Sequence, residues 1–393
     1  MLTDGALRML VLLHFNQLGF SPIQLAYLFI LYEIAGILTN MTAGWIAARF
    51  GLSATLYAGL IVQIGAVAAL TLLSPEWGVV ASVAFVMAIQ GAAGVAKDLT
   101  KMSSKSAVKI LAPDSPGGLF KWVAVLTGSK NAVKGLGFFL GAACLGLFGF
   151  EPTLWAMVIF LITVLGALVA FMPRGLPTGR KSAKFTQVFA RSRDVNWLSA
   201  ARVFLFGARD VWFVVGIPIY FTTVFSDGTP EGNRAAFFLI GTFMAVWIIL
   251  YGAVQANAPR IIGRERSLAE MKLAALNWVG LLFIIPFFLA FATVHFDGPL
   301  WILTSMLVIG LLAFGAVFAV NSSLHSYLIL ALSKDRDVTM DVGFYYMANA
   351  SGRLLGTLLS GLSYQIGGLP MTLGTAALMI CFSWLCARKL ARA

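Results

Sequence analysis

The chain has 393 residues, of which 60% are hydrophobic and 11% are charged, and its mean hydropathy is +0.89. This composition excludes a soluble globular protein, because a soluble surface does not accommodate such a share of apolar side chains. The formal net charge of +12 would by itself be compatible with nucleic-acid binding.

Twelve apolar segments, separated by Pro, Gly and polar residues, are predicted to cross a membrane. They cover residues 2–19, 24–47, 53–74, 79–103, 119–148, 152–172, 196–225, 232–257, 268–293, 299–330, 340–363 and 369–387. The longest polar interruption divides them into six and six. We therefore expect an all-α integral membrane bundle with an N-terminal six-helix half at 1–172, a cytoplasmic linker at 173–195 and a C-terminal six-helix half at 196–393.

Basic residues predict the orientation of these segments. With both termini on the cytoplasmic side, the inner loops carry seventeen Lys and Arg residues, whereas the outer loops carry only Arg234. Cytoplasmic loops of membrane proteins carry such an excess. The positive net charge therefore indicates membrane topology and not nucleic-acid binding.

Two short matches indicate that the halves are related by a repeat. Gly5-Ala6 with Arg8 in the first segment resembles Gly207-Ala208-Arg209 in the seventh. Asn131-Ala132 with Lys134-Gly135 in the fifth resembles Asn349-Ala350 with Arg353 in the eleventh. Both matches fall where a parallel repeat of six segments places them.

One stretch concentrates lysines within apolar sequence. These are Lys97, Lys101, Lys105, Lys109, Lys121, Lys130 and Lys134. The first four recur at every fourth residue and form a stripe on one helix, where like charges repel. A charge in hydrocarbon costs about 2.5–3.5 kcal/mol on insertion scales. An anionic ligand would compensate for this cost.

Charged residues deep in the predicted segments extend this argument. The basic ones, our candidate substrate-binding residues, are Arg8, Lys97, Lys101, Lys130, Lys134, Arg209 and Arg353, and the acidic ones are Asp4, Glu33, Asp98 and Asp210. They occupy segments one, two, four, five, seven and eleven, so we expect these to line a central water-filled cavity. The surplus of three cations predicts a ligand with two or more negative charges, because phosphate-like oxyanions accept both Lys and Arg.

Mutual neutralisation of the charges is the alternative. Asp4 and Arg8 are four residues apart on one helix face, and Asp98 or Asp210 could pair with a neighbouring Lys. The four acids are also candidates for proton coupling, since apolar surroundings disfavour an ionised carboxylate. For Glu33, a proton-carrying role and a salt bridge to another helix both remain open.

Three other basic residues, Lys121, Arg202 and Lys272, lie near predicted cytoplasmic ends, where we expect them to extend to the interface. His325, with Asn321 and Ser326, either lines a polar surface or is a packed histidine.

Catalytic motifs are not found in the sequence. It has no nucleophile–base constellation and no metal-binding cluster, so we expect a protein that is not an enzyme and has no cofactor or metal. Gly137-x-x-x-Gly141 and Gly352-x-x-x-Gly356 are typical of closely packed membrane helices.

Gly44 to Gly51 resembles the G-x-x-x-D-R-x-G loop of the major facilitator superfamily, with Ala48 where that loop has Asp. Four further segments, TDGALRMLVLLHF, GVAKDLTKMSSKSAVKILAP, WVAVLTGSKNAVKGLGFFLGA and LSAARVFLFGARDVWFVVGIPIY, resemble the organoarsenical efflux permeases of the ArsJ type within that superfamily. The first segment is shorter than in that family, so we expect a truncated first helix.

The resemblance implies a multi-pass protein of the bacterial inner membrane that exports 1-arseno-3-phosphoglycerate and confers arsenate resistance. It also implies a functional link to glyceraldehyde-3-phosphate dehydrogenase, which makes that ester from arsenate. Transport of another organophosphate or organic anion remains open, as do two less favoured classes, an enzyme or flippase acting on phospholipid headgroups and a passive scaffold.

Overall fold

The computed structural model describes residues 1–74, 76–111, 118–172, 192–263, 267–333 and 338–392, with side chains except at 41, 43–45, 47–48, 52, 102–111, 118–128, 338–340 and 342. Its helices are α1 (Leu2–Gln17), α2 (Pro22–Tyr27), α3 (Ile30–Phe50), α4 (Leu52–Leu70), α5 (Val79–Leu111), α6 (Gly118–Phe148), α7 (Phe150–Phe171), α8 (Arg193–Val211), the π-helix η1 (Trp212–Gly216), α9 (Ile217–Phe225), α10 (Pro230–Ile262), α11 (Leu268–His295), α12 (Leu300–Leu332) and α13 (Val338–Arg392).

These helices reproduce the predicted membrane segments. Ten helical stretches in the described residues are long and apolar enough to cross a membrane. The last of them, within α13, contains two helices, because the backbone is non-helical at Gly367 and Gly368. With the shorter helix α1, the total is the predicted twelve. The all-α membrane bundle is therefore confirmed.

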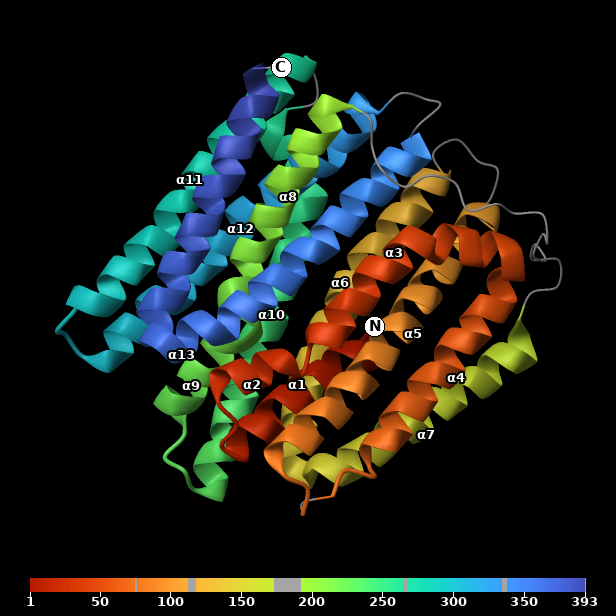
Figure 1. Cartoon of the computed structure of the whole chain (residues 1–393), viewed down its shortest axis with the longest axis vertical. Coiled ribbons are helices and arrows are strands. Elements are labelled where there is room, and N and C mark those ends of the chain that lie inside the picture. Colours follow the sequence, from red (N-terminus) through yellow and green to blue (C-terminus); the bar gives the residue numbers. More distant parts are fainter. Residues whose placement is uncertain (75, 112–117, 173–191, 264–266, 334–337, 393) are drawn as a thin grey trace.

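Most helices in the first part of the chain pack against one another, and so do those in the last part. Helix α1 packs on α6, and α5 packs on α3 and α4, while α13 packs on α8 and α11. In Figure 1, α4, α5 and α7 lie on one side of the view and α11, α12 and α13 on the other. The boundaries at 172 and 195 stay a prediction, because 173–191 lies outside the described residues.

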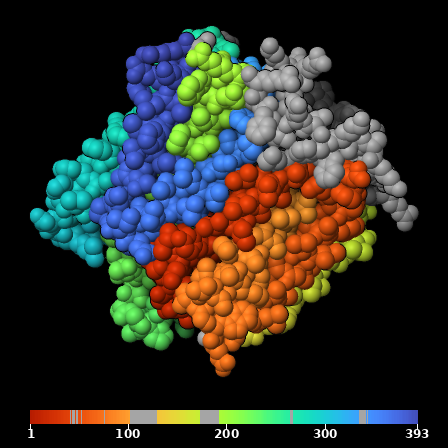
Figure 2. Space-filling view, in the orientation of Figure 1, coloured from red at the N-terminus to blue at the C-terminus, as the bar shows by residue number. Residues whose placement is uncertain are grey.

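Two sets of contacts join these groups of helices. Helix α6 packs along α10, and α13 packs against α2 and α3. The second contact is visible on the surface, where the red N-terminal helices lie beside the blue C-terminal ones (Figure 2). Charged residues of α1, α3, α8 and α13 therefore lie close to the junction between the groups.

The outermost helices present apolar side chains to their surroundings. Ile159 and Ile162 of α7 are 63% and 53% exposed, and Phe287 and Phe288 of α11 are also exposed. Helices α7 and α11 are the least buried of the membrane-length helices in the described residues. Their outer faces suit lipid contact.

Glycines allow two pairs of helices to approach with backbones in contact. A Cβ at Gly137 or Gly141 of α6 would collide with the carbonyls of Leu2 and Ala6 of α1, and one at Gly352 or Gly356 of α13 would collide with those of Val203 and Gly207 of α8. The predicted close packing at both glycine motifs is confirmed. These contacts have the same spacing on both helix pairs.

That common spacing fixes the register of the repeat. Arg8 lies two residues after Ala6, and Arg209 two after Gly207, so these two arginines are equivalent. Lys134 lies three residues before Gly137 and is therefore equivalent to Asn349, three before Gly352. The sequence match that paired Lys134 with Arg353 was out of register with the packing.

Helix α8 continues into a wide π-helical turn, η1. This turn changes the hydrogen-bond pattern, and the backbone N–H groups of Val215 and Gly216 donate to Ser360 Oγ of α13 at 3.1 and 3.2 Å. Ser360 is fully buried. A π-turn inside an α-helix is rare. The Ser360 hydroxyl accepts hydrogen bonds from two of its buried N–H groups and thereby stabilises the turn.

We predict that Ser360→Ala destabilises the protein by about 1–3 kcal/mol, because it removes the side-chain acceptor that two buried N–H groups share. Thermal unfolding in detergent micelles measures this loss. The matched control is Ser351→Ala, since Ser351 Oγ on the same helix donates only to the carbonyl of Met347 one turn earlier. Equal losses for the two variants would show that Ser360 has no special role at the π-turn.

Candidate functional site

Glu33 of α3 lies between two guanidinium groups from distant parts of the chain. Arg8 of α1 has Nη2 3.3 Å from Glu33 Oε1, and Arg353 of α13 donates from Nη2 to the same oxygen at 2.6 Å. The Glu33 side chain is 1% exposed, so water screens these ion pairs weakly. One carboxylate thus connects α1, α3 and α13.

Arg353 extends this network to α8. Its Nε lies 3.8 Å from Asp210 Oδ2, and Arg209 donates from Nε to Asp210 Oδ1 at 2.6 Å. Arg353 therefore lies between two carboxylates, Glu33 and Asp210. The resulting chain of five charged side chains crosses from α1 to α8, and each of its two carboxylates contacts two arginines.

Tyr32, next to Glu33 on α3, connects two further charged residues. Its hydroxyl donates to Asp4 Oδ1 at 2.6 Å and accepts from Lys97 Nζ at 3.0 Å. The same ammonium group lies 4.1 Å from the centre of the Tyr32 ring. Both the hydroxyl and the ring face of Tyr32 thus stabilise the Lys97 cation.

Asp98 of α5 has three neighbours that stabilise its charge. Lys97 and Lys101 place Nζ 3.7 and 3.5 Å from Asp98 Oδ1, and Thr39 of α3 donates to Oδ2 at 2.8 Å. Asp98 is therefore shared between two lysines of the predicted stripe. The structure does not describe the side chains of the next two, Lys105 and Lys109.

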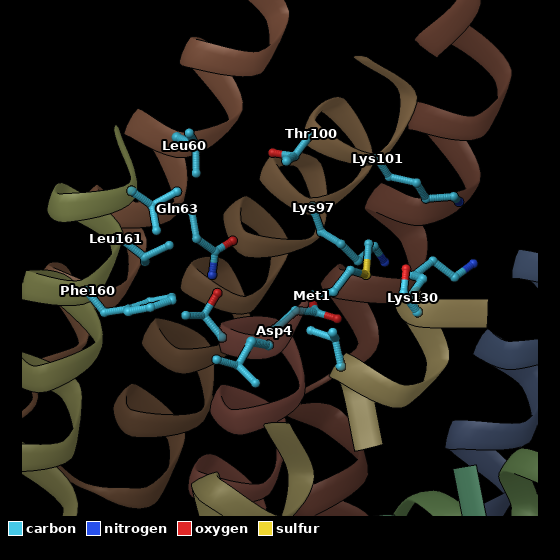
Figure 3. Close-up of a pocket in the computed structure, with 15 residues that line it drawn as sticks. Met1, Asp4, Leu60, Gln63, Lys97, Thr100, Lys101, Lys130, Phe160 and Leu161 are labelled. Carbon is cyan, nitrogen blue, oxygen red and sulfur yellow. The ribbon is translucent and has the colours of Figure 1, made fainter. Parts of the chain in front are cut away.

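A cavity of about 390 Å³ lies beside these lysines. Helices α1, α4, α5, α6 and α7 form it. Its polar lining consists of Thr3, Asp4, Gln63, Lys97, Thr100, Lys101, Ser129 and Lys130. In Figure 3, Lys97, Lys101 and Lys130 lie on one side of this cavity, and Phe160 and Leu161 lie on the other. The cavity thus offers a cationic wall and an apolar wall.

Lys134 of α6 differs from the other deep cations. Its ammonium group lies 5.3 Å from the ring of Phe138, and no carboxylate of the described residues lies within 4.0 Å of it. Even with Lys130 left aside, the cluster contains six deep cations but only the four carboxylates of Asp4, Glu33, Asp98 and Asp210. Pairing is therefore extensive, but the cluster keeps a positive surplus.

The predicted alternative of mutual neutralisation is only partly correct. Contacts with a carboxylate are observed for Arg8, Lys97, Lys101, Arg209 and Arg353. Asp4 and Arg8, both within the described residues, do not form the ion pair that their spacing suggested, because Asp4 bonds to Tyr32 and Arg8 to Glu33. Of the two roles left open for Glu33, the observed geometry is that of a salt bridge.

One of the three residues expected to extend to the membrane interface lies elsewhere. Arg202 is 5% exposed and donates to Asn349 and Ser322 inside the bundle, so the prediction was wrong for it. Lys272 is 9% exposed and donates at 2.9 Å to Asp194. This pair lies near the starts of α8 and α11. The third, Lys121, has a side chain outside the described part of the chain.

Sequence reasoning missed two residues of the network, Tyr32 and Thr39. Both lie on α3 and bond to charged groups of other helices. The available signal was their position on the same helix as Glu33, with Tyr32 directly beside it. Their partners depend on how α3 is rotated, which a single sequence does not specify.

Comparison with solved structures identifies the class of fold. A POT family transporter in complex with 5-aminolevulinic acid superposes with a TM-score of 0.72 at 13% identity, covering 99% of this chain and 94% of that one. A bacterial homologue of the iron transporter ferroportin gives 0.71 at 12%, covering 100% and 96%, and a mutant of the nucleoside transporter NupG gives 0.71 at 14%, covering 99% and 95%. The fold is that of a multi-pass membrane transporter.

The family is defined by sequence. Residues 1–329 match the family model of the Major Facilitator Superfamily, and the chain belongs to that family. It is therefore a secondary membrane transporter of the major facilitator type, which acts on small substrates within the lipid bilayer. No curated protein matches the chain.

We predict that Glu33→Gln lowers the free energy of unfolding by about 3–5 kcal/mol, because it leaves two buried guanidinium groups without their shared carboxylate. Unfolding in detergent micelles measures the loss. Adding Arg8→Met to Glu33→Gln removes one of the stranded charges, so the double variant loses less than the sum of the two single losses.

The control for this prediction is Asp194→Asn. Its pair with Lys272 lies at the start of α8, where the Asp194 side chain is 25% exposed, so water screens this pair more than the pairs of Glu33 and we expect a smaller loss of stability. If Asp194→Asn lowered the free energy of unfolding as much as Glu33→Gln, burial of Glu33 would not be the reason for its large effect.

Proposed function

We propose that this transporter exports an anionic organoarsenical phosphate ester, 1-arseno-3-phosphoglycerate, by alternating access, and so confers resistance to arsenate. The observation that carries the proposal is the positive surplus of the deep charge cluster, which contains more cations than its four carboxylates can neutralise. An ester with negative charge at both ends balances such a surplus. The export direction and the arsenical rest on the sequence resemblance.

The proposed binding residues are the seven deep cations, Lys97, Lys101, Lys130, Lys134, Arg209, Arg353 and Arg8. Arginine offers a planar fork to an oxyanion, and lysine offers a compact charge. The cavity between α1, α4, α5, α6 and α7 brings three of the lysines together, and the network around Glu33 holds the three arginines. The two groups meet at Tyr32, which contacts Lys97 and directly precedes Glu33.

Competition for Arg353 would couple substrate binding to movement. Glu33 and Arg353 form an ion pair between α3 and α13, which belong to opposite groups of helices. An anion bound by Arg353 competes with Glu33 and weakens this connection, so the two groups become free to rearrange. A carboxylate that loses its cation in apolar surroundings favours its protonated form. Glu33, Asp98, Asp210 and Asp4 are therefore the candidates for proton coupling.

The same chemistry also suits a second candidate function, transport or exchange of another organophosphate or organic anion. Charge and fork geometry select an oxyanion, but they do not select arsenic over phosphorus. The proposed link to glyceraldehyde-3-phosphate dehydrogenase distinguishes the candidates, because only the arsenical route needs that enzyme together with arsenate on the loading side.

Proteoliposomes that enclose glyceraldehyde-3-phosphate dehydrogenase, its substrate, NAD and arsenate test the proposal, because the ester then forms inside. We expect arsenic to leave the vesicles only when both the enzyme and the transporter are present. Lys134→Met and Arg209→Gln should each lower the rate about tenfold or more, which corresponds to loss of one charge-assisted contact.

Lys389→Met serves as the matched control, because Lys389 is exposed near the end of α13, in the second of its two helices, whereas Arg353 lies in the first. It should transport at the rate of the unmodified protein. Arsenic release that is independent of the transporter would end the arsenical proposal. Uptake of 3-phosphoglycerate with the same dependence on Lys134 and Arg209 would favour the second candidate.

A further inference from the structure

A buried arginine outside the central network has only neutral partners. Arg202 of α8 donates from Nε to Asn349 Oδ1 at 3.0 Å and from Nη1 to the carbonyl and hydroxyl oxygens of Ser322, both at 3.1 Å. It is 5% exposed, and no carboxylate of the described residues lies within 4.0 Å of it. A full positive charge is thus held inside the bundle without a counter-ion, and its Nη2 has no hydrogen-bond partner among the described residues.

Polar groups that can serve an anion surround this guanidinium. Tyr251 of α10 has its hydroxyl 3.5 Å from Ser322 Oγ, and the ring of Tyr345 of α13 lies 4.8 Å from Arg202 Cζ. His325 lies one turn beyond Ser322 on the same face of α12. It is 1% exposed, and neither of its ring nitrogens has a hydrogen-bond partner in the described structure. A buried imidazole with two unsatisfied nitrogens is costly unless a ligand satisfies it.

The position of Arg202 relates it to Arg209. The two residues are seven apart on α8, so they share a helix face and are separated by about 10 Å. Phe206 lies between them, with the Cζ atoms of Arg202 and Arg209 3.9 and 4.9 Å from its ring centre. The two guanidinium groups therefore flank one aromatic ring, and Arg202 lies nearer the end of the bundle at which α8 begins.

We propose that Arg202, with Ser322 and His325, forms a second anion site for a phosphate-like oxyanion, which the substrate occupies while that end of the carrier is open. The substrate then passes along Phe206 to Arg209. A guanidinium with Nη2 still available and with neutral neighbours suits this role, because Nη2 can donate to an oxyanion and there is no carboxylate to displace. This transport role rests on the proposed function, whereas anion binding at Arg202 does not.

Binding of inorganic phosphate tests the site directly. The measurement is the phosphate concentration that gives half-maximal thermal stabilisation of the purified full-length protein, in an Arg209→Gln background that weakens the central network. We expect this background to retain phosphate binding, and added Arg202→Gln to weaken it about tenfold or more. Arg202→Lys, which keeps the charge but loses the fork, should fall between the two.

Lys272→Gln is the matched control, since Lys272 is similarly buried but is paired with Asp194. It should leave the half-maximal phosphate concentration unchanged. A half-maximal concentration that Arg202→Gln shifts by less than twofold would overturn the site. If Arg202→Gln does not fold, Arg202→Lys decides in its place, and an unchanged concentration in that variant also overturns it.

Transport from each face separates a binding role from a structural one. We expect Arg202→Gln to raise KM about tenfold for substrate offered at the face where α8 begins, with KM at the opposite face unchanged. A purely structural arginine would instead lower the maximal rate from both faces, and that result would overturn the inference. Phosphate binding that depends on Arg202, without organoarsenical transport, would overturn the proposed function and leave this site standing.

Discussion

The charge of Glu33 organises the centre of this protein. A carboxylate in an apolar bundle is stable only with partners close by, and Glu33 has two, Arg8 and Arg353, on helices that belong to different groups. Arg353 in turn shares Asp210 with Arg209. Displacing one member of this chain leaves another charged side chain without its partner. The contact between the two groups of helices is therefore electrostatic as well as apolar.

Close backbone packing sets where these charges fall. The glycines of α6 and α13 bring α1 and α8 to the same distance and register, so that Arg8 and Arg209 occupy equivalent depths. The equivalence does not extend to every charge, since Lys134 corresponds to Asn349. The two groups of helices thus share a packing scheme but carry different polar residues on it. Such asymmetry suits a substrate whose two ends differ.

Much of the fold could be predicted from the sequence. Long apolar runs specify the membrane segments, and the spacing of Gly137 and Gly141 specifies close packing, because both are local properties of the chain. The set of deep charges was likewise visible in the sequence, and the structure brings Arg8, Glu33, Arg209, Asp210 and Arg353 into one network.

The partners of each charge could not be predicted. Asp4 and Arg8 have ideal spacing for an ion pair, yet each bonds to α3, because the rotation of α3 brings Tyr32 and Glu33 closer. Arg202 was expected at the interface from its distance along the chain, but Asn349 and Ser322 hold it inside. Both errors arise from helix rotation and tilt, which depend on the packing of all helices at once.

The π-turn at Trp212–Gly216 allows the seventh segment to lose one residue while the side chains on both sides of the turn keep their orientation. A turn of this kind contains one residue more than an α-helix needs, and each residue of an α-helix rotates the face by about 100°. Removing one residue from this turn converts it to an ordinary α-helical turn, and Arg209 and the apolar face of α9 keep their orientations. The same deletion elsewhere in a packed segment would rotate one end relative to the other. Length variation among related transporters can therefore be absorbed at this point.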